Sequence, residues 1–409
     1  MLKRVCYLSF AMQCVFVASG PWVNGEDAID PIIVSQRAQE LHRSALLIDG
    51  HNDLPWKMRD RSSLTFDKLD LAKHQPELHT DIPRLLEGGV GAQFWSVYVP
   101  VSTMSDGVSL SMTLEQIDFV DAMMKKFPDT FELALTVQDI RRIHASGKIA
   151  SLIGVEGGHA IENSLNVLHQ LYRRGARYMT LTHSKNLDWA DSATDDPSTG
   201  GLTPFGEEVI REMNRLGMMV DLSHVSPATM KHALRITQSP ILFSHSSARA
   251  VADHPRNVPD DVLNLTAKNN GVVMVNFYPS FVVPEAAKLS VQRLVLAGQL
   301  KAELADEDEI DRRLDRWDAE HPRPTGSIHD VVDHIDHIVK VAGIDHVGLG
   351  SDYDGIPSVP DQLEDVSDFP KITQVLLDRG YSDDEIRKIL GENLMRVMKE
   401  VEAAADRLK

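Results

Sequence analysis

The stretch ALLIDGHND, at residues 45–53, contains the pattern that decides the fold. It begins with the apolar run Ala45–Asp49, which has the length of a buried strand, and it continues into Gly50-His51-Asn52-Asp53. Side chains two residues apart in an extended strand lie on the same face, so His51 and Asp53 could bind one metal ion together. The stretch therefore predicts a buried strand that ends in metal ligands.

Seven more short β-rich runs follow this one, and longer segments of helical periodicity separate them. Most of the runs are continuously apolar, as is typical of parallel strands buried on both faces. The eight runs are Ala45–Asp49, Gly91–Val99, Ile149–Val155, Tyr178–Thr182, Met218–Leu222, Ile241–Ser244, Gly271–Phe277 and His346–Gly350. Alternation of this kind indicates an α/β fold with a parallel sheet, and eight β/α units predict one (β/α)8 barrel of the TIM type.

The segments between the runs are long enough for crossover helices. The expected helices are Ile161–Arg174, Pro204–Leu216, Pro227–Ile236 and Pro259–Asn269, with closing helices in 355–409. A doubly wound open sheet is the alternative, but its nucleotide-binding form carries G-x-G-x-x-G after the first strand, and no such motif follows residue 49. We predict a single catalytic barrel over 26–409. A charged insertion at about 283–325 is interpreted as a solvated helical hairpin in preference to a substrate lid.

Residues 1–25 have the outline of a secretory signal peptide. Lys3 and Arg4 precede the apolar run Val5–Ala18, and small residues follow it up to Gly25. A membrane anchor is the alternative, but the run is shorter than the roughly 20 residues that span a bilayer. We therefore expect cleavage after Gly25, no stable membrane anchor, and a secreted or periplasmic protein.

The cysteine content and the net charge restrict the chemistry further. Both cysteines, Cys6 and Cys14, lie in the predicted signal peptide, and the residues before Cys14 match a lipoprotein signal poorly. The mature chain is thus expected to have neither disulfides nor thiolate ligands, so a metal would be held by His, Asp and Glu. The formal charge of −18 argues against nucleic acid as a partner, because its phosphates demand a basic face.

Six of the eight runs end in His, Asp or Glu, and the active site of a TIM barrel lies where its strands end. The residues at these ends are His51, Asp53, Glu156, His183, Asp221, His224, His245 and Asp352. Other histidines lie in helical or loop stretches, where we expect surface positions. They include His74, His79, His169, His232, His329, His334 and His337.

The number of donors suggests two metal ions. His51, Asp53, Glu156, His224 and His245 are one ligand more than a closed tetrahedral site uses. If Glu156 bridges two ions, each ion receives three protein ligands and keeps a position for a shared water. Mixed imidazole and carboxylate ligands suit zinc, with manganese or cobalt as alternatives in vitro. Two such ions about 3.5 Å apart would activate that water and polarise a carbonyl group.

The motifs resemble the membrane (renal-type) dipeptidase family of zinc peptidases. The matching stretches are DGHNDLP (49–55), EGGH (156–159), LTH (181–183), DLSH (221–224), FSHSSA (243–248), RNV (256–258) and GSDYDG (350–355). They occur in family order over nearly the whole predicted mature chain. The insertion at 283–325 resembles that of bacterial members, and the chain lacks the cysteines and the lipid-anchor tail of mammalian ones.

The resemblance implies a TIM barrel, two zinc ions bridged by a glutamate, and hydrolysis of free dipeptides through attack by a metal-bridging hydroxide. It implies that His183 stabilises the oxyanion, that Arg256 binds the substrate carboxylate, and that Asp352 transfers the proton. It also implies a homodimer, and activity on some β-lactams and on dipeptides with a C-terminal D-residue. For Arg256 a loop salt bridge is the alternative, and for Asp352 the rival is Asp354.

Two other functions fit the same fold. One is an amidohydrolase-type barrel with a carbamylated lysine as the bridge, for which Lys185 is the only candidate near the fourth run. Its substrate would be an N-acyl amino acid, a cyclic amide or a phosphotriester. The other is a peptide-binding barrel without turnover, although every expected ligand is present.

Overall fold

The computed structural model describes residues 30–409, so the predicted signal peptide with both cysteines lies outside the described residues. The described chain has nine strands, all in parallel pairs. They are β1 (Leu47–Asn52), β2 (Val90–Ser96), β3 (Phe131–Leu133), β4 (Ile149–Glu156), β5 (Ala176–Thr180), β6 (Met219–Asp221), β7 (Leu242–Phe243), β8 (Val272–Val275) and β9 (Val347–Leu349). Each predicted run overlaps one of these strands, and β3 is the additional one.

Eight of the strands close into a barrel. The hydrogen-bonded order is β1, β2, β4, β5, β6, β7, β8 and β9, and β9 pairs again with β1. The short β3 stands outside this ring, because it pairs with Ile149–Ser151 at the start of β4 while β5 pairs with Ile153–Glu156. The predicted (β/α)8 barrel is thus confirmed. The open-sheet alternative is wrong, since an open sheet would leave two unpaired edges.

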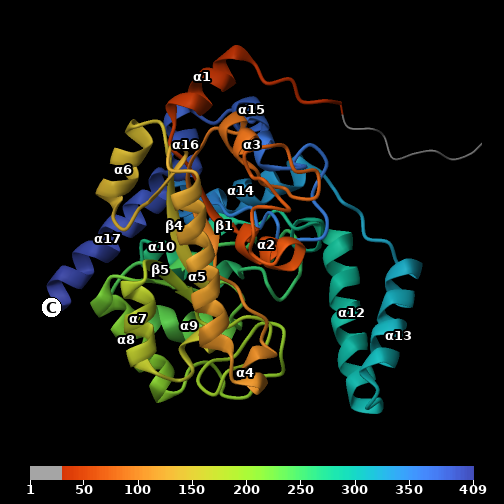
Figure 1. Ribbon diagram of the computed structural model, residues 1–409. Helices are drawn as coiled ribbons and strands as arrows, with labels where there is room; N and C mark the ends of the chain where they lie inside the picture. The colour runs from red at the N-terminus through yellow and green to blue at the C-terminus, as the bar shows by residue number, and fades with distance from the viewer. Residues whose placement is uncertain (1–29) are drawn as a thin grey trace, which may run out of the picture. The chain divides into compact units, whose positions relative to one another are not determined.

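Helices surround the barrel (Figure 1). They are α1 (Gln36–Ser44), α2 (Leu54–Ser62), α3 (Ile82–Glu87), α4 (Thr103–Asp106), α5 (Ser109–Lys126), α6 (Val137–Ala145), α7 (Leu165–Arg173), α8 (Pro204–Leu216), α9 (Pro227–Ile236), α10 (Asp260–Lys268), α11 (Pro279–Val282), α12 (Pro284–Glu303), α13 (Glu307–Glu320), α14 (Ile328–Ala342), α15 (Phe369–Asp378), α16 (Asp383–Arg387) and α17 (Asn393–Leu408). Short segments η1 (Gly158–Ile161), η2 (Ile344–His346), η3 (Val366–Asp368) and η4 (Lys388–Glu392) complete the described structure.

The predicted crossover helices begin at polar caps. Thr203 accepts a hydrogen bond from the backbone N–H of Gly206 at the start of α8, and Ser226 accepts one from Thr229 at the start of α9. In both helices a proline follows the cap, where its missing N–H costs nothing. Both helices therefore have the bounds that the sequence predicted, and α7 and α10 lie within their predicted segments.

The barrel interior is apolar at the end where the strands begin. Ile48, Phe94 and Met274 pack there against Leu394 and Val397 of α17. A larger apolar cluster fills the space between the strands and the surrounding helices. With one barrel end covered by α17, the carboxyl ends of the strands are left for the site.

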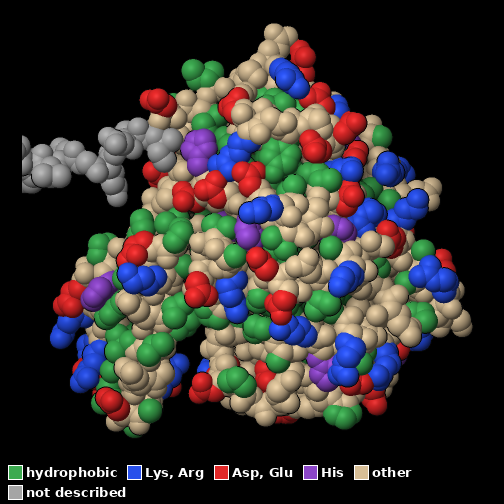
Figure 2. Space-filling model, turned by 180° about the vertical axis from the view of Figure 1, so that it is seen from behind, with side chains coloured by type: hydrophobic (Ala, Val, Ile, Leu, Met, Phe, Trp, Pro, Cys, Tyr) green, Lys and Arg blue, Asp and Glu red, His purple; other side chains and the backbone are tan. Residues whose placement is uncertain are grey.

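The segment 283–325 contains α12 and α13, which form an arm beside the barrel (Figure 1). The arm has a small core of its own, made by Leu300, Ile310 and Leu314, and an ion pair of 2.7 Å joins Arg293 to Asp318. On the face shown in Figure 2, acidic and basic side chains are interspersed. Within residues 30–409, no helix combines the length and the apolar character needed to cross a membrane.

His334 corrects one expectation from the sequence. The prediction placed it on the surface, but its side chain on α14 is fully buried. Its Nδ1 atom accepts from the backbone N–H of Ala248 at 2.9 Å, and its Nε2 atom lies 3.0 Å from the carbonyl oxygen of Val282. A buried imidazole is stable when both nitrogens have partners, and the sequence shows neither partner.

Candidate metal centre and active site

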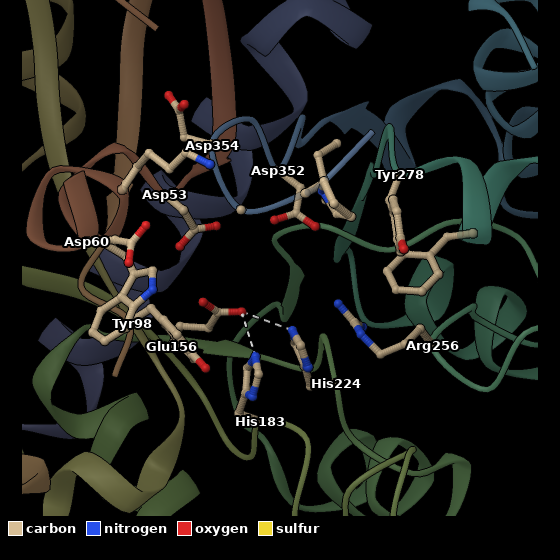
Figure 3. Close-up of a pocket in the computed structure, with 16 residues that line it drawn as sticks. Asp53, Asp60, Tyr98, Glu156, His183, His224, Arg256, Tyr278, Asp352 and Asp354 are labelled. Atoms are coloured by element: carbon tan, nitrogen blue, oxygen red, sulfur yellow. Dashed lines mark ion pairs between the residues drawn. The ribbon is translucent and has the colours of Figure 1, made fainter. Parts of the chain in front are cut away.

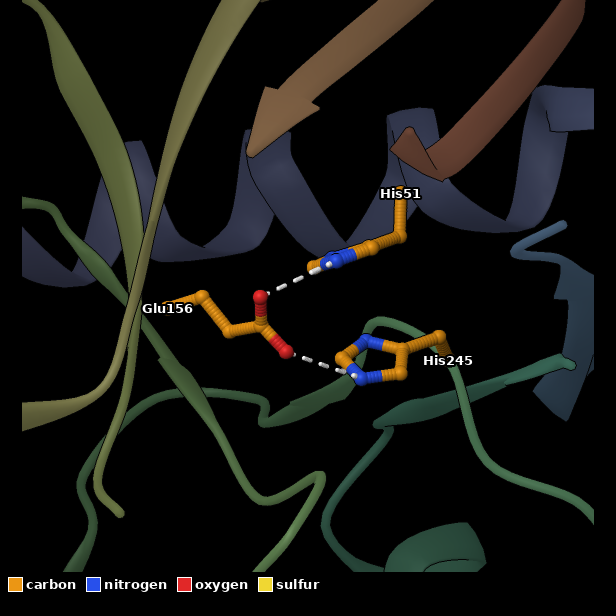
Figure 4. A group of neighbouring side chains, drawn as sticks. All are labelled: His51, Glu156 and His245. Atoms are coloured by element: carbon orange, nitrogen blue, oxygen red, sulfur yellow. Dashed lines mark ion pairs between the residues drawn. The ribbon is translucent and has the colours of Figure 1, made fainter. Parts of the chain in front are cut away.

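A cavity of about 480 Å³ opens at the carboxyl ends of the strands (Figure 3). Six of the residues predicted from the sequence line it, namely Asp53, Glu156, His183, His224, Arg256 and Asp352. The other two, His51 and His245, lie buried next to Glu156 (Figure 4). No residue of α12 or α13 is among the described residues that line this cavity.

Glu156 is the last residue of β4 and stands at the centre of the site. Its Oε2 atom faces Nε2 of His51 at 3.5 Å. Its Oε1 atom instead faces Nε2 of His224 at 2.9 Å and Nε2 of His245 at 3.5 Å. The two carboxylate oxygens thus point to different sets of imidazoles, as a bridging ligand requires.

The separations between donors match those of metal ligands. Ligand atoms about 2.0–2.1 Å from a tetrahedral zinc ion lie about 3.4 Å from one another, and Nε2 of His51 is 3.2 Å from Oδ2 of Asp53. His51 Nε2 and Asp53 Oδ1 are also buried without a hydrogen-bond partner. Such atoms are rare in a folded protein unless an ion or a water completes them. The five predicted ligands therefore fit metal ions.

The protonation states of the ligands also suit a cation. Burial lowers the pKa of His224 and of His245 well below the usual value, so both imidazoles are neutral and offer a lone pair. Burial opposes ionisation of Glu156, but His51, His224 and His245 around it hold its pKa well below the ordinary range. Glu156, His224 and His245 thus combine a carboxylate with two neutral imidazoles, while Asp53 and Glu156 beside His51 raise the pKa of that imidazole. Mixed carboxylate and imidazole donors are the set expected for zinc.

Glycines make room for the inner side of the site. A Cβ atom on Gly350 would lie 1.9 Å from the carbonyl oxygen of Ser244, and one on Gly50 would lie 2.6 Å from the same atom. His51 directly follows Gly50, Asp352 lies two residues after Gly350, and Ser244 directly precedes His245. Only glycine at both positions lets these three strand ends approach one another.

Asp352 approaches the cluster from the end of β9. Its carboxylate belongs to a group with His51 and Asp53 whose ligand atoms lie within 4.8 Å of one another, and its Oδ2 atom accepts from Nδ2 of Asn276 at 2.7 Å. Burial raises its pKa well above the usual range, and the nearby Asp53 and Glu156 add to this effect. A carboxyl group held in this way is suited to proton transfer.

Asp352 and His224 both have left-handed backbone conformations, with φ of 65° and 68°. Residues other than glycine adopt this conformation at a cost, and it is frequent at functional sites. The rival Asp354 also has a positive φ of 65°, but its Oδ1 atom accepts from the backbone N–H of His79 at 2.8 Å. The contacts therefore favour Asp352 as the carboxylate that serves the cluster.

Arg256 lies on the side of the cavity opposite Asp53 and Tyr98 (Figure 3). It is 3% exposed, and within residues 30–409 no carboxylate lies within ion-pair distance of it. Its Nε atom is buried without a partner, and its guanidinium lies 5.2 Å from the ring centre of Phe281. The loop salt bridge is therefore absent. A cation held this way is suited to an anionic group that enters the cavity.

His183 follows β5 and borders both Glu156 and the open cavity. Its Nε2 atom is 3.7 Å from Oε1 of Glu156, and its Nδ1 atom is 3.2 Å from Oγ of Ser184. Burial lowers its pKa to about 4, so the imidazole is neutral at pH 7. If Ser184 donates to Nδ1, the proton is on Nε2, the nitrogen on the side of Glu156.

Lys185 takes no part in this cluster. Its Nζ atom forms an ion pair of 2.8 Å with Asp195, and nearly half of its side chain is exposed. The position between the imidazoles is filled by Glu156. The carbamylated-lysine bridge is therefore not supported by the structure.

Two residues that contact the site residues were not identified from the sequence. Asn276 directly follows β8. The run that contains β8 and the second run are the two for which the sequence showed no His, Asp or Glu at the end. Tyr178 lies inside the barrel, where its hydroxyl is 2.9 Å from Nδ1 of His51. A polar residue inside an otherwise apolar run could have indicated Asn276, whereas Tyr178 looks like an ordinary core residue in the sequence.

The barrel and the buried cluster define the chain as a TIM barrel with a candidate metal-binding centre at its strand ends. The family model for membrane dipeptidase (peptidase family M19) matches residues 35–409. The chain therefore belongs to the membrane dipeptidase family, a family of metal-dependent dipeptidases. This confirms the resemblance inferred from the sequence motifs.

Solved structures agree with this assignment. The probable dipeptidase PvdM from Pseudomonas aeruginosa is 26% identical, with a TM-score of 0.80 over 90% of this chain and 98% of that one. A metallo peptidase from Rhodobacter sphaeroides, liganded with a phosphinate mimic of L-Ala-D-Ala, is 24% identical, with a TM-score of 0.72 over 87% of this chain and 99% of that one. An amidohydrolase from Pseudomonas aeruginosa is 22% identical, with a TM-score of 0.68 over 89% and 98%. The last two comparisons support the fold.

Proposed function

We propose that this protein is a zinc-dependent dipeptidase with two metal ions per chain. One ion would be held by His51, Asp53 and Glu156, and the other by Glu156, His224 and His245. The observation that carries the proposal is the division of the Glu156 carboxylate, whose Oε2 atom faces His51 while its Oε1 atom faces His224. A pair of zinc ions so held supplies an activated water and polarises the scissile carbonyl.

The protein groups around the metal ligands complete the reaction. Asp352 takes the proton from the attacking water and delivers it to the leaving amine, and Asn276 holds its carboxylate in place at 2.7 Å. His183, neutral at pH 7, donates from Nε2 to the oxygen that becomes negative as the peptide bond is attacked. Such a donor lowers the barrier by about 3–4 kcal/mol in other hydrolases.

Arg256 explains why the substrate would carry a free carboxylate next to the scissile bond, as a free dipeptide does. Its guanidinium is a planar donor that matches a carboxylate in two parallel hydrogen bonds. It lies across the cavity from Asp53 (Figure 3), so a substrate carboxylate at Arg256 places the adjacent peptide bond toward the metal ligands. The volume of about 480 Å³ suits a small ligand. A peptide bond further from the C-terminus would have no terminal carboxylate within reach of Arg256.

The test uses the purified mature protein, from which any signal peptide has been removed. We expect about two zinc ions per chain, and turnover of L-Ala-L-Ala and L-Ala-D-Ala that a chelator abolishes and zinc restores. N-acetyl-L-alanine and L-Ala-L-alaninamide serve as matched controls. The first has an acetyl group in place of the N-terminal residue, and the second has an amide in place of the terminal carboxylate. Turnover of the N-acyl amino acid without turnover of dipeptides would favour the amidohydrolase alternative. Dipeptide binding without turnover would identify a binding protein.

Three further proposals accompany this assignment. We propose that the enzyme accepts C-terminal D-residues and some β-lactams, because Arg256 recognises the carboxylate and not the chirality beside it. We propose export to the periplasm or the medium, which N-terminal sequencing of the mature protein would test by finding a start after residue 25. We also propose a homodimer, which light scattering of the purified protein would test.

A further inference from the structure

His245 is connected to a buried carboxylate through one serine hydroxyl. Oγ of Ser244 lies 2.8 Å from Nδ1 of His245 and 2.6 Å from Oδ2 of Asp221. All three side chains are almost completely buried. Asp221 ends β6 and Ser244 follows β7, so the connection crosses from one strand end to the next.

Among the described residues, every other hydrogen-bond partner of Asp221 is also a donor. Its Oδ1 atom accepts from the backbone N–H groups of Ser223 at 3.0 Å and Ser244 at 2.9 Å. Its Oδ2 atom accepts from the hydroxyl of Thr180 as well as from that of Ser244. Four donors use all the acceptor positions of an ionised carboxylate. Asp221 is thus an acceptor only.

The direction of the protons follows from this. Because Asp221 only accepts, the hydroxyl proton of Ser244 points to Asp221. Oγ of Ser244 then has only lone pairs to offer His245, so Nδ1 of His245 carries a proton. A neutral imidazole has one such proton, which leaves the lone pair on Nε2, the atom 3.5 Å from Glu156.

We infer that Asp221, acting through Ser244, is a positioning residue that fixes the tautomer of His245 so that its Nε2 atom is free to bind a metal ion. The inference rests on the proposed function, because it concerns the same metal centre. Partners that hold the far nitrogen of a metal-binding imidazole contribute about 10- to 100-fold to metal affinity.

Asp49 and Ser351 repeat the pairing of a buried aspartate with a serine hydroxyl at another pair of strand ends, without a histidine after the serine. Asp49 accepts at Oδ1 from the backbone N–H groups of His51 and Ser351, and at Oδ2 from the hydroxyl of Ser351 at 2.6 Å. The residue after Ser351 is Asp352, which has no imidazole to orient. Ser351 can also donate to the carbonyl oxygen of His51 at 3.2 Å. The chain therefore contains its own control.

The experiment measures zinc affinity by competition with a chromophoric chelator, without substrate. In Asp221→Asn the amide N–H₂ donates to Ser244, whose proton then turns to Nδ1 of His245 and moves the imidazole proton to Nε2. We expect the affinity for one of two zinc ions to fall about 10- to 100-fold. Asp49→Asn, which keeps both backbone contacts at Oδ1, is expected to bind both zinc ions as the wild type does.

Ser244→Ala and the double variant Asp221→Asn/Ser244→Ala complete a thermodynamic cycle. Ser244→Ala should weaken the same zinc ion, and adding Asp221→Asn to it should cause little further loss, because the connection is already broken. Equal losses from Asp221→Asn in both backgrounds, wild-type affinity in Asp221→Asn, or an equal loss in Asp49→Asn would each overturn the inference. Circular dichroism verifies folding, and if Asp221→Asn does not fold, wild-type affinity in Ser244→Ala overturns it alone. A wild-type protein that binds fewer than two zinc ions would instead contradict the proposed function.

Discussion

Asn276 donates a hydrogen bond of 2.7 Å to Asp352, from the strand end next to that of Asp352. The contact fixes one oxygen of a carboxylate that lies beside His51 and Asp53. We predict that Asn276→Ala lowers kcat by about 10- to 100-fold, because a hydrogen bond to a charged group is worth about 1.5–3 kcal/mol. Steady-state kinetics with L-Ala-L-Ala should show little change in KM. Asn264→Ala, which removes an exposed amide of α10, is the matched control and should leave kcat unaffected.

Asp352→Asn is expected to keep its zinc and to lose turnover by about 10²- to 10⁴-fold, the usual contribution of a general acid–base group. Metal analysis and kinetics on the same preparation separate the two effects. Asp354→Asn, two residues away in the same loop, should have the smaller effect, since Asp354 is turned to the backbone of His79. The reverse order would exchange the two roles.

Arg256→Met should reduce kcat/KM for L-Ala-L-Ala by roughly 100-fold, mostly through KM, because one charge-assisted pair of hydrogen bonds to the substrate is lost. The rate with L-Ala-L-alaninamide should not change, since that substrate has no carboxylate to lose contact with. If both substrates lose rate equally, Arg256 acts on the architecture of the site and not on the carboxylate.

Glu156→Gln should bind zinc far more weakly, because the carboxylate that lies between His51, His224 and His245 becomes neutral. A ligand present at 100 times its Kd stabilises the fold by about 2.7 kcal/mol. Zinc should therefore raise the Tm of the wild type and raise that of Glu156→Gln much less. The exposed Glu162→Gln is the control, and it should respond to zinc as the wild type does.

His334 makes stability depend on pH. Burial lowers its pKa to about 4 from the usual 6.5, so between these values the unfolded chain binds a proton that the folded chain does not. The contribution of the neutral His334 side chain to the free energy of unfolding is fully present above pH 6.5. It is lost as the pH falls, by about 1.4 kcal/mol per pH unit and by about 3 kcal/mol in total at pH 4. With a chelator present, the Tm of His334→Gln should fall less between pH 7 and pH 5 than that of the wild type. His74→Gln, at an exposed position, should fall as the wild type does.

The sequence predicted the barrel because buried parallel strands are continuous apolar runs, and each of eight such runs overlaps a barrel strand. It also predicted which side chains gather, since all strands end at the same rim. His51, Glu156 and His245 come from strands far apart in the chain, and the structure brings them together. The strand β3 was not predicted, because three residues carry too little periodicity to separate from a loop.

The partners of these side chains could not be predicted. Tyr178 and Asn276 act through atoms that lie next to other strands, and no spacing in the sequence encodes that proximity. His334 was placed wrongly for the same reason, since its burial depends on the backbone of Ala248 and Val282. A sequence shows which residues end a strand, whereas the register between strands decides what they touch.

The positive φ angles of His224 and Asp352 have a consequence for directed evolution. Left-handed backbone at a residue with a Cβ atom costs of the order of 1 kcal/mol, and glycine removes that cost. A screen for the heat resistance of the metal-free protein alone would therefore reward glycine at both positions and yield stable barrels without hydrolytic activity. Directed evolution of this protein therefore has to select for turnover and for thermal stability in the same round.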